Sequence, residues 1–189
     1  MLVHIDFIEG QLEQLTTEIE AVLTPFTEPV ALLETIPCIG HTAAVTIIAE
    51  IGTDMTRFPS AKHLAWWAGV CPGNRQSAGK RLGGRTTGGN PWLRAILGEV
   101  AWSIAHTSSS YLAAQYHRFA RRSGKPKAIV AVCHSLLVII YHMLRTRSAY
   151  YDLGPDYFES LENERLQRHS VRRLEQLGFA VTLSSPQIA

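Results

Sequence analysis

The stretch from Pro72 to Arg94, PGNRQSAGKRLGGRTTGGNPWLR, holds six glycines and no acidic residue. With so few apolar side chains it cannot form a core of its own, so the rest of the chain must hold its ends. Glycines let a backbone approach a ligand closely, and successive N–H groups in such turns bind anions. Five basic residues predict a polyanionic ligand: Arg75, Lys80, Arg81, Arg85 and Arg94. The alternative is a solvated surface loop.

The formal net charge of +2 hides a strong asymmetry along the chain. Residues 1–54 hold nine acidic residues and no Lys or Arg, whereas residues 71–130 hold ten Lys or Arg and one acid, Glu99. Residues 131–189 hold six of each sign. Such segregation points to nucleic acid more strongly than the overall pI does. The basic third is expected to face phosphate, and the acidic third to face protein or water.

The length of 189 residues fits one or two domains, and a hydrophobic fraction of 46% is enough for a core. Cys38, Cys71 and Cys133 are odd in number and lie far apart, so neither a disulfide framework nor a zinc site is expected. A reducing cytoplasm fits, and the N-terminus lacks the basic region of a signal peptide. The apolar residues 128–144 are slightly too few for a membrane span and contain Ser135 and two histidines, so they predict a buried core helix.

The N-terminal segment has an apolar residue at alternating spacings of three and four: Ile5, Ile8, Leu12, Leu15, Ile19, Val22 and Phe26. This is a heptad seam, and Pro25 is expected to end its helix just after Val22. One interpretation is a helix packed on its own domain. The narrow seam favours a coiled-coil arm through which two copies associate.

The segment LLETIPCIGHTAAVTIIAEIG, residues 32–52, predicts a helix that ends near Thr35, a tight turn at 36–40 and a second helix from about Thr42. It resembles the helix–hairpin–helix motif of DNA-binding proteins. In that arrangement the free N–H groups at the start of the second helix hold a phosphate oxygen without reading the base sequence. The candidate residues are Gly40, His41 and Thr42. The alternative is an ordinary αα-hairpin.

Capping signals predict the later helices. Ser60 is expected to open a helix that ends at Gly69 and contributes Trp66 and Trp67 to the core. Asn90, followed by proline, is expected to cap a long helix. Further helices are expected at 111–122, 128–144 and 157–177, the last as one exposed helix or a pair.

A second basic cluster ends the helix at 111–122. Its candidate DNA-binding residues are Arg118, Arg121 and Arg122. Both basic segments are expected to meet on one face.

Ser77 is the candidate nucleophile of the basic stretch. A serine hydroxyl can attack a phosphodiester while neighbouring cations stabilise the highly charged transition state. Metal-assisted phosphoryl transfer needs convergent carboxylates, and the basic region offers only Glu99, with Glu50 and Asp54 as candidates by default. No metal site is therefore predicted in this chain. Ser77 also lacks the nucleophile elbow of a Ser–His–acid hydrolase.

Two ordered motifs, IPCIGHTAAVTIIAEIG and RFPSAKHLAWWAGVCPGNRQSAGKRLGGRTTGGNPWLR, resemble the C-terminal transposase domain of DEDD-type insertion-sequence transposases. These enzymes are relatives of certain DNA invertases and are bridge-RNA-guided recombinases. The resemblance runs from about Leu32 to Leu144, and RRLEQLGFAVTL is similar to that family's tail. In the family, a RuvC-like nuclease domain with four metal-binding acids precedes a coiled coil and this domain. The domain's serine becomes covalently linked to DNA, and the matching position is Ser77.

The chain departs from that family by starting within what resembles the coiled-coil arm, without the nuclease domain. The expectation is a truncated reading frame, a decayed element or a separately encoded half.

The sequence thus predicts an all-α chain containing a helix-hairpin-helix. Its expected parts are a coiled-coil arm (1–28), a transposase domain (29–150) and a helical extension with a tail (151–189). The expected function is that of the DNA-binding, serine-bearing part of a transposase. The alternative is a non-catalytic DNA- or RNA-binding regulator of the intact enzyme. Expected partners are DNA, a structured guide RNA and a second copy, without a membrane. No cofactor is expected on this chain, because Mg²⁺ belongs to the nuclease domain.

Overall fold

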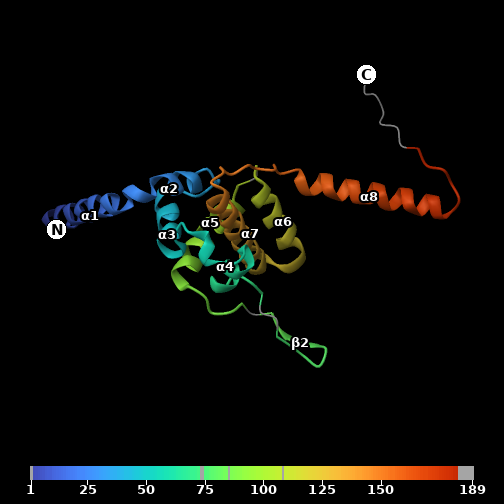
Figure 1. Cartoon of the computed structure of the whole chain (residues 1–189), viewed down its shortest axis with the longest axis horizontal. Coiled ribbons are helices and arrows are strands. Elements are labelled where there is room, and N and C mark those ends of the chain that lie inside the picture. The colour runs from blue at the N-terminus through green and yellow to red at the C-terminus, as the bar shows by residue number, and fades with distance from the viewer. Residues whose placement is uncertain (1, 73–74, 85, 108, 183–189) are drawn as a thin grey trace, which may run out of the picture.

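The computed structural model describes residues 2–72, 75–84, 86–107 and 109–182 (Figure 1). The predicted all-α class is confirmed, with one small β-hairpin added. The helices are α1 (Leu2–Leu23), α2 (Thr27–Glu34), α3 (His41–Ile51), α4 (Ala61–Trp67), α5 (Pro91–Ala105), α6 (Tyr111–Ser123), α7 (Lys125–Thr146) and α8 (Tyr157–Gln176). Two 3-10 turns, η1 (Thr24–Phe26) and η2 (Met55–Arg57), and two strands, β1 (Arg75–Ser77) and β2 (Lys80–Gly83), complete the order.

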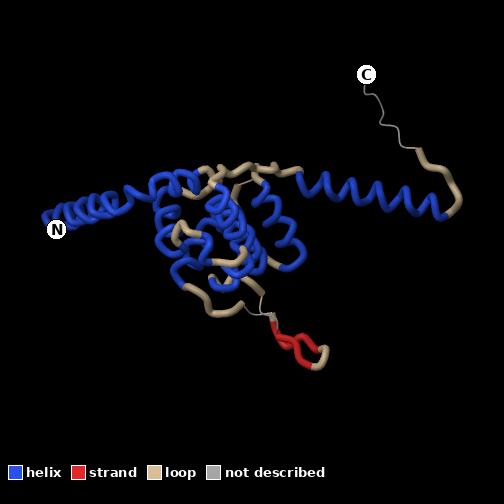
Figure 2. The backbone as a smooth tube through the Cα atoms, viewed as in Figure 1, coloured by secondary structure: helices blue, strands red, loops and turns tan. Residues whose placement is uncertain are grey.

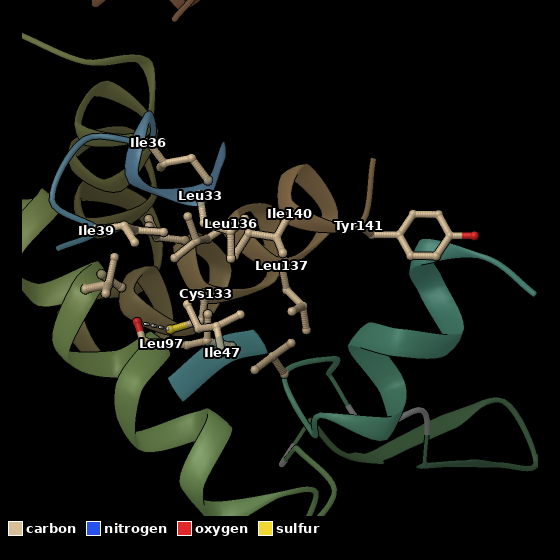
Figure 3. Close-up of a cluster of buried hydrophobic side chains, with 14 of the residues drawn as sticks. Leu33, Ile36, Ile39, Ile47, Leu97, Cys133, Leu136, Leu137, Ile140 and Tyr141 are labelled. Carbon is tan, nitrogen blue, oxygen red and sulfur yellow. Dashed lines mark hydrogen bonds between the residues drawn. The ribbon is translucent and has the colours of Figure 1, made fainter. Parts of the chain in front are cut away.

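The helix α7 lies at the centre of the core. It packs against α2, α4, α5 and α6, and nine of its residues are buried. Figure 3 shows its side chains meeting those of α2, α3, α5 and the turn between α2 and α3. Among the described residues, α7 is the one helix long and apolar enough to cross a membrane, but half of its most apolar window is buried inside the protein. That burial is what the predicted core helix requires.

Side-chain caps explain the starts of α5 and α6. The Asn90 carboxamide oxygen accepts from Leu93 N at 3.0 Å, and the Ser110 hydroxyl accepts from Ala113 N at 3.2 Å. Both caps satisfy N–H groups that a helix start otherwise leaves unpaired. Ser60 also precedes its helix as predicted, but its hydroxyl pairs with His63 Nδ1 at 2.9 Å and caps no backbone N–H.

The structure shows that the prediction of a buried Trp66 is wrong. Its side chain is 65% exposed, whereas the prediction placed it in the core. The short helix α4 buries the face formed by Ala61, Leu64 and Ala65, so Trp66 points to solvent. Trp67 is half-exposed and packs its ring against Phe58, with 5.7 Å between the centroids.

The terminal helices α1 and α8 leave the core on opposite sides (Figure 1). Every residue of the predicted α1 seam from Ile5 to Val22 is at least 45% exposed, so α1 does not pack on its own domain. The helix α8 is a single helix with no buried residue. Both arms therefore present apolar side chains that the single chain does not cover.

Candidate nucleic-acid interface

The basic stretch contains a β-hairpin that the sequence analysis did not predict (Figure 2). Strands β1 and β2 pair antiparallel, with Ser77 opposite Lys80 and Gln76 opposite Arg81. The two residues between the strands, Ala78 and Gly79, have φ of +49° and +75°. Positive φ at both central positions is the geometry of the tight turn whose twist matches a hairpin. The predicted nucleophile therefore lies directly before the turn, paired in register with a lysine.

Two glycines clamp the base of this hairpin segment to the core. A Cβ on Gly89 would lie 2.3 Å from the Ala68 carbonyl oxygen, and a Cβ on Gly69 would lie 2.9 Å from the Gly89 Cα. Both glycines have positive φ, at +54° and +71°. Only glycine tolerates such an approach in this conformation. The outgoing and returning ends of the segment therefore meet at the end of α4.

A second contact fixes the point at which the hairpin segment rejoins the core. Asn90 caps α5 and also donates from its side-chain amide to the Glu50 carboxylate near the end of α3, at 2.5 Å. Glu50, a default metal candidate in the sequence, is thus a structural acceptor. Arg94 lies in the first turns of α5 with an exposed side chain.

Trp92 is a residue that sequence reasoning missed at this site. It lies in the first turn of α5, and its side chain is 72% exposed. A single exposed aromatic ring is common on protein surfaces, but nucleic-acid-binding proteins can use such a ring to stack bases. The signal available in the sequence was its position two residues after the capping Asn90, in the first turn of the expected helix.

The segment predicted to form a helix-hairpin-helix consists of α2, the turn at 36–40 and α3, an arrangement that an ordinary αα-hairpin shares. Ile36 and Ile39 fix the turn by burying their side chains in the core (Figure 3). Gly40 has an extended backbone at the N-cap of α3, and no side chain caps the first turn. Gly40, His41 and Thr42 are all exposed. Uncapped N–H groups that face solvent at a helix start can bind an anion.

A carboxylate lies next to that helix start. His41 Nδ1 is 2.7 Å from the Glu34 carboxylate. When His41 is protonated, the pair is an ion pair, and when it is neutral, the contact is a hydrogen bond. Glu34 therefore competes with any phosphate for this histidine.

The helix start and the hairpin lie at different ends of α3. The Glu50–Asn90 contact joins the C-terminal end of α3 to the base of the hairpin segment. Gly40 precedes the other end, about 15 Å away at 1.5 Å per residue. The predicted sites are thus not one cluster, and a ligand that meets both must span at least about 15 Å.

The second basic cluster is at the end of α6. In Figure 1 the turn from α6 to α7 and the hairpin lie toward the same, lower side of the core. Arg118 is already engaged, 3.0 Å from the Glu162 carboxylate and 5.4 Å from the Phe158 ring centroid. Arg122 lies over Phe119 at 5.4 Å, and Arg121 is exposed.

Other reactive groups of the described chain serve structural roles. Hydrogen bonds from the Thr56 hydroxyl and backbone N–H lower the pKa of Asp54, which ties that carboxylate to η2. Burial raises the pKa of Cys133 to about 12, and its thiol donates to the Leu97 carbonyl at 3.3 Å. No group of three or more His, Cys, Asp or Glu residues is positioned to hold a metal within the described part.

Residue 85 lies outside the described residues, so the structure gives no placement for Arg85. For Arg75, Ser77 and Arg81, the structure describes the backbone of the strands alone.

The comparison with protein families gives a match to a transposase family. Residues 30–117 match the model of the Transposase IS116/IS110/IS902 family, a range that contains most of α2, all of α3 to α5 with the hairpin, and the first half of α6. No curated protein matches the chain. The match supports a transposase-family domain and a role in transposition, and such a domain implies interaction with DNA.

Proposed function

We propose that this chain is the DNA-binding, serine-bearing part of an insertion-sequence transposase. Its transposase-family domain, residues 30–117, contains both the uncapped start of α3 and the basic hairpin. The proposed DNA contacts are Gly40, His41, Thr42, Arg75, Lys80, Arg81, Arg85, Arg94, Arg118, Arg121 and Arg122.

One observation carries the proposal: Ser77 is paired in register with Lys80 beside a two-residue turn. The hairpin stands away from the helical core (Figure 2), to which Gly69 and Gly89 clamp the base of the segment. A nucleophile must reach the scissile phosphate, and a cation beside it stabilises the charge that develops there. A hairpin that carries Ser77 and Lys80 beside its turn and is held to the core at its base meets both requirements.

In the proposed step, the Ser77 hydroxyl oxygen attacks phosphorus of a DNA phosphodiester. A serine–phosphorus ester bond forms while one phosphorus–oxygen bond to deoxyribose breaks. The serine proton passes to solvent, and the departing sugar oxygen takes up a proton as a hydroxyl. Attack on the new ester by a sugar hydroxyl of another strand end reverses these changes and joins DNA. No oxidant or reductant is needed.

Of the two default candidates for a metal ligand, the Glu50 carboxylate accepts from Asn90 and the Asp54 carboxylate accepts from Thr56. We therefore propose that metal-dependent DNA cleavage, where the reaction needs it, is supplied by a nuclease domain acting together with this part. The steps assigned to this chain are binding, positioning and the serine attack.

The test is covalent capture on insertion-element ends. The chain is incubated with labelled DNA, with and without a separately supplied nuclease domain of such a transposase, and resolved under denaturing conditions. A labelled protein–DNA adduct that disappears in Ser77→Ala supports the proposal. Ser60→Ala is the matched control, because Ser60 lies directly before α4 and outside the hairpin. Absence of an adduct under both conditions would sink the catalytic role.

A non-catalytic regulator is the second candidate function, favoured by the exposed seam of α1. A chain that binds DNA and associates with other copies can occupy element ends or combine with intact enzyme. This candidate predicts DNA binding without an adduct. A structured guide RNA is a further proposed ligand of the basic surface, to be compared with duplex DNA in the same binding assay.

A further inference from the structure

The helices α6 and α8 form the two sides of a groove. The match to the transposase family ends at residue 117 and so does not include α8. An aromatic cluster fixes the start of α8 against α6. The Tyr111 ring stacks on Phe158 at 5.0 Å and meets Tyr157 edge-on at 5.3 Å. The Arg118–Glu162 ion pair adds a second link one turn further along. The angle between the two helices is therefore set by contacts.

The groove is open and has a volume of about 1460 Å³. That exceeds the roughly 300–1,000 Å³ typical of small-molecule sites, so a macromolecular occupant fits it better. Its apolar lining consists of Phe119, Phe158, Leu161 and Val171. Its charged lining consists of five arginines, Arg118, Arg122, Arg165, Arg168 and Arg172, and two acids, Glu162 and Glu175.

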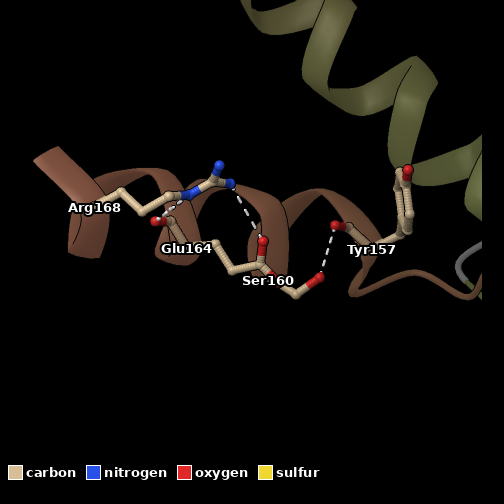
Figure 4. A network of polar contacts seen from close by, with 4 residues as sticks. All are labelled: Tyr157, Ser160, Glu164 and Arg168. Atoms are coloured by element: carbon tan, nitrogen blue, oxygen red, sulfur yellow. Dashed lines mark hydrogen bonds and ion pairs between the residues drawn. The ribbon is translucent and has the colours of Figure 1, made fainter. Parts of the chain in front are cut away.

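Not all of these arginines have a partner in the chain. Arg168 pairs with Glu164 on the same helix at 3.4 Å (Figure 4), and Arg118 pairs with Glu162. Arg165 and Arg172 have no acidic partner within the described ranges. An occupant that suits the groove is elongated, acidic and apolar along one stripe.

The arm α1 has these properties. It carries five acidic residues and no Lys or Arg: Asp6, Glu9, Glu13, Glu18 and Glu20. Its seam from Ile5 to Val22 is uncovered. Its 22 residues and the 20 residues of α8 give helices of similar length, roughly 30 Å at 1.5 Å per residue.

The two surfaces cannot meet within one chain, because α1 and α8 point away from opposite sides of the core (Figure 1). We propose that α1 of one copy docks in the α6–α8 groove of a second copy. The apolar seam covers the floor, and the acids face Arg165 and Arg172. Opposite charges across an interface set register and exclude wrong pairings.

Pairing of two α1 helices with each other is the competing arrangement. It covers the seam equally well but brings together two helices that each hold five acids and no Lys or Arg. Like charges brought together oppose association. It also leaves the α6–α8 groove empty, whereas docking in the groove covers both apolar surfaces.

A charge-swap experiment on the full chain tests the docking. One variant carries Glu9→Lys and Glu18→Lys, which flank the seam of α1. The other carries Arg165→Glu and Arg172→Glu in α8, neither of which the DNA proposal uses. Molecular mass is followed by sedimentation across protein concentration. Each variant alone is expected to associate at least about tenfold more weakly than wild type, because like charges then face each other.

Mixing the two variants is the decisive measurement. Each reversed surface then meets a complementary one on the other variant, so association is expected to return. Arg173→Glu, outside the groove lining, should associate as wild type does. Far-ultraviolet circular dichroism checks that every variant stays helical.

Three outcomes would overturn the inference. A wild-type chain that stays monomeric at all concentrations would show that the proposed interface does not form. Normal association of the α8 variant indicates that α1 pairs with α1. An α8 variant that loses DNA or RNA affinity while keeping its mass assigns the groove to nucleic acid. The adduct assay of Ser77 does not depend on these results, so the two proposals fail separately.

Discussion

The side-chain amide of Asn90 donates a hydrogen bond to the carboxylate of Glu50, forty positions earlier in the chain. The same side chain accepts from Leu93 N and caps α5. One residue therefore fixes where α5 begins and how that start sits against α3. Because the hairpin segment returns to the core at this point, the contact also positions the basic surface.

Replacement of Asn90 by alanine should remove both bonds at once. Loss of the cap and of a partly buried hydrogen bond is expected to lower the free energy of unfolding by about 1–3 kcal/mol. Urea denaturation measures the change. Glu50→Gln is the control, because its carboxamide oxygen can still accept, and it should cost less than about 1 kcal/mol. Equal losses in the two variants would contradict the assigned role of the cap.

Gly69→Ala and Gly89→Ala should each destabilise the fold by more than about 2 kcal/mol, because the new Cβ meets backbone atoms and φ is positive. Gly98→Ala is the matched control. Gly98 lies inside α5 with nothing within 4 Å of the added Cβ, so alanine should stabilise the protein by up to about 1 kcal/mol. Thermal unfolding shows whether each variant is less stable or more stable than the wild type. A tolerated Gly89→Ala would mean that the hairpin base is not clamped.

Basic residues of the hairpin segment should set the salt dependence of duplex binding. Each phosphate contact contributes about −0.9 to the log–log slope of affinity against salt. The variant Arg81→Ala/Arg85→Ala should flatten the slope by up to about 1.8. Arg145→Ala/Arg147→Ala, at the far end of α7, should leave it unchanged. A slope near zero in the wild type would make the segment ordinary solvated surface.

Trp92 should report on DNA directly. If its exposed ring stacks on bases, single-stranded DNA will quench the intrinsic fluorescence of the protein, and Trp92→Phe will show less quenching. Alanine at this position is expected to weaken binding by about 1–3 kcal/mol. Trp102→Phe is the control, since that ring is also exposed, at 55%, but lies near the other end of α5. Equal quenching in both variants would exclude stacking at Trp92.

Stability should fall in mild acid. Burial lowers the pKa of His134 below its ordinary value, so the unfolded chain takes up this proton at a higher pH than the folded chain. The contribution of the neutral histidine is therefore fully present above about pH 6.5 and is lost as the pH falls toward the folded-state pKa. Urea midpoints at pH 7.5 and about 5.5 measure the loss. His134→Gln should show a smaller drop than wild type, whereas His169→Gln on the exposed α8 should match wild type.

The positions of the helices could be predicted because their signals are local. Asn90 caps its helix at the expected residue, the helix at Tyr111 begins where it was expected, and the apolar residues 128–144 form most of a core helix. The hairpin could not be predicted in the same way. Its turn residues, Ala78 and Gly79, are not a strong turn pair, and isolated strands this short get little support from propensity.

The candidate site was predictable only in its composition. Basic residues, glycines and Ser77 marked the segment, but nothing in the sequence placed Ser77 opposite Lys80. The exposure of Trp66 was mispredicted, because on so short a helix the partners in the core decide which face is buried.

The sequence alone determined the all-α class, the acidic arm, the segregation of charge and the residues able to touch phosphate, because periodicity and charge are properties of neighbouring residues. Three relationships were decided by the tertiary structure alone. Gly69 and Gly89 hold the base of the hairpin segment to the core, Glu50 accepts a hydrogen bond from Asn90, and α1 and α8 leave opposite sides of the core. These relationships join residues that lie far apart in the chain. They exist only once burial of the core has fixed where each helix runs, and no local pattern encodes that placement.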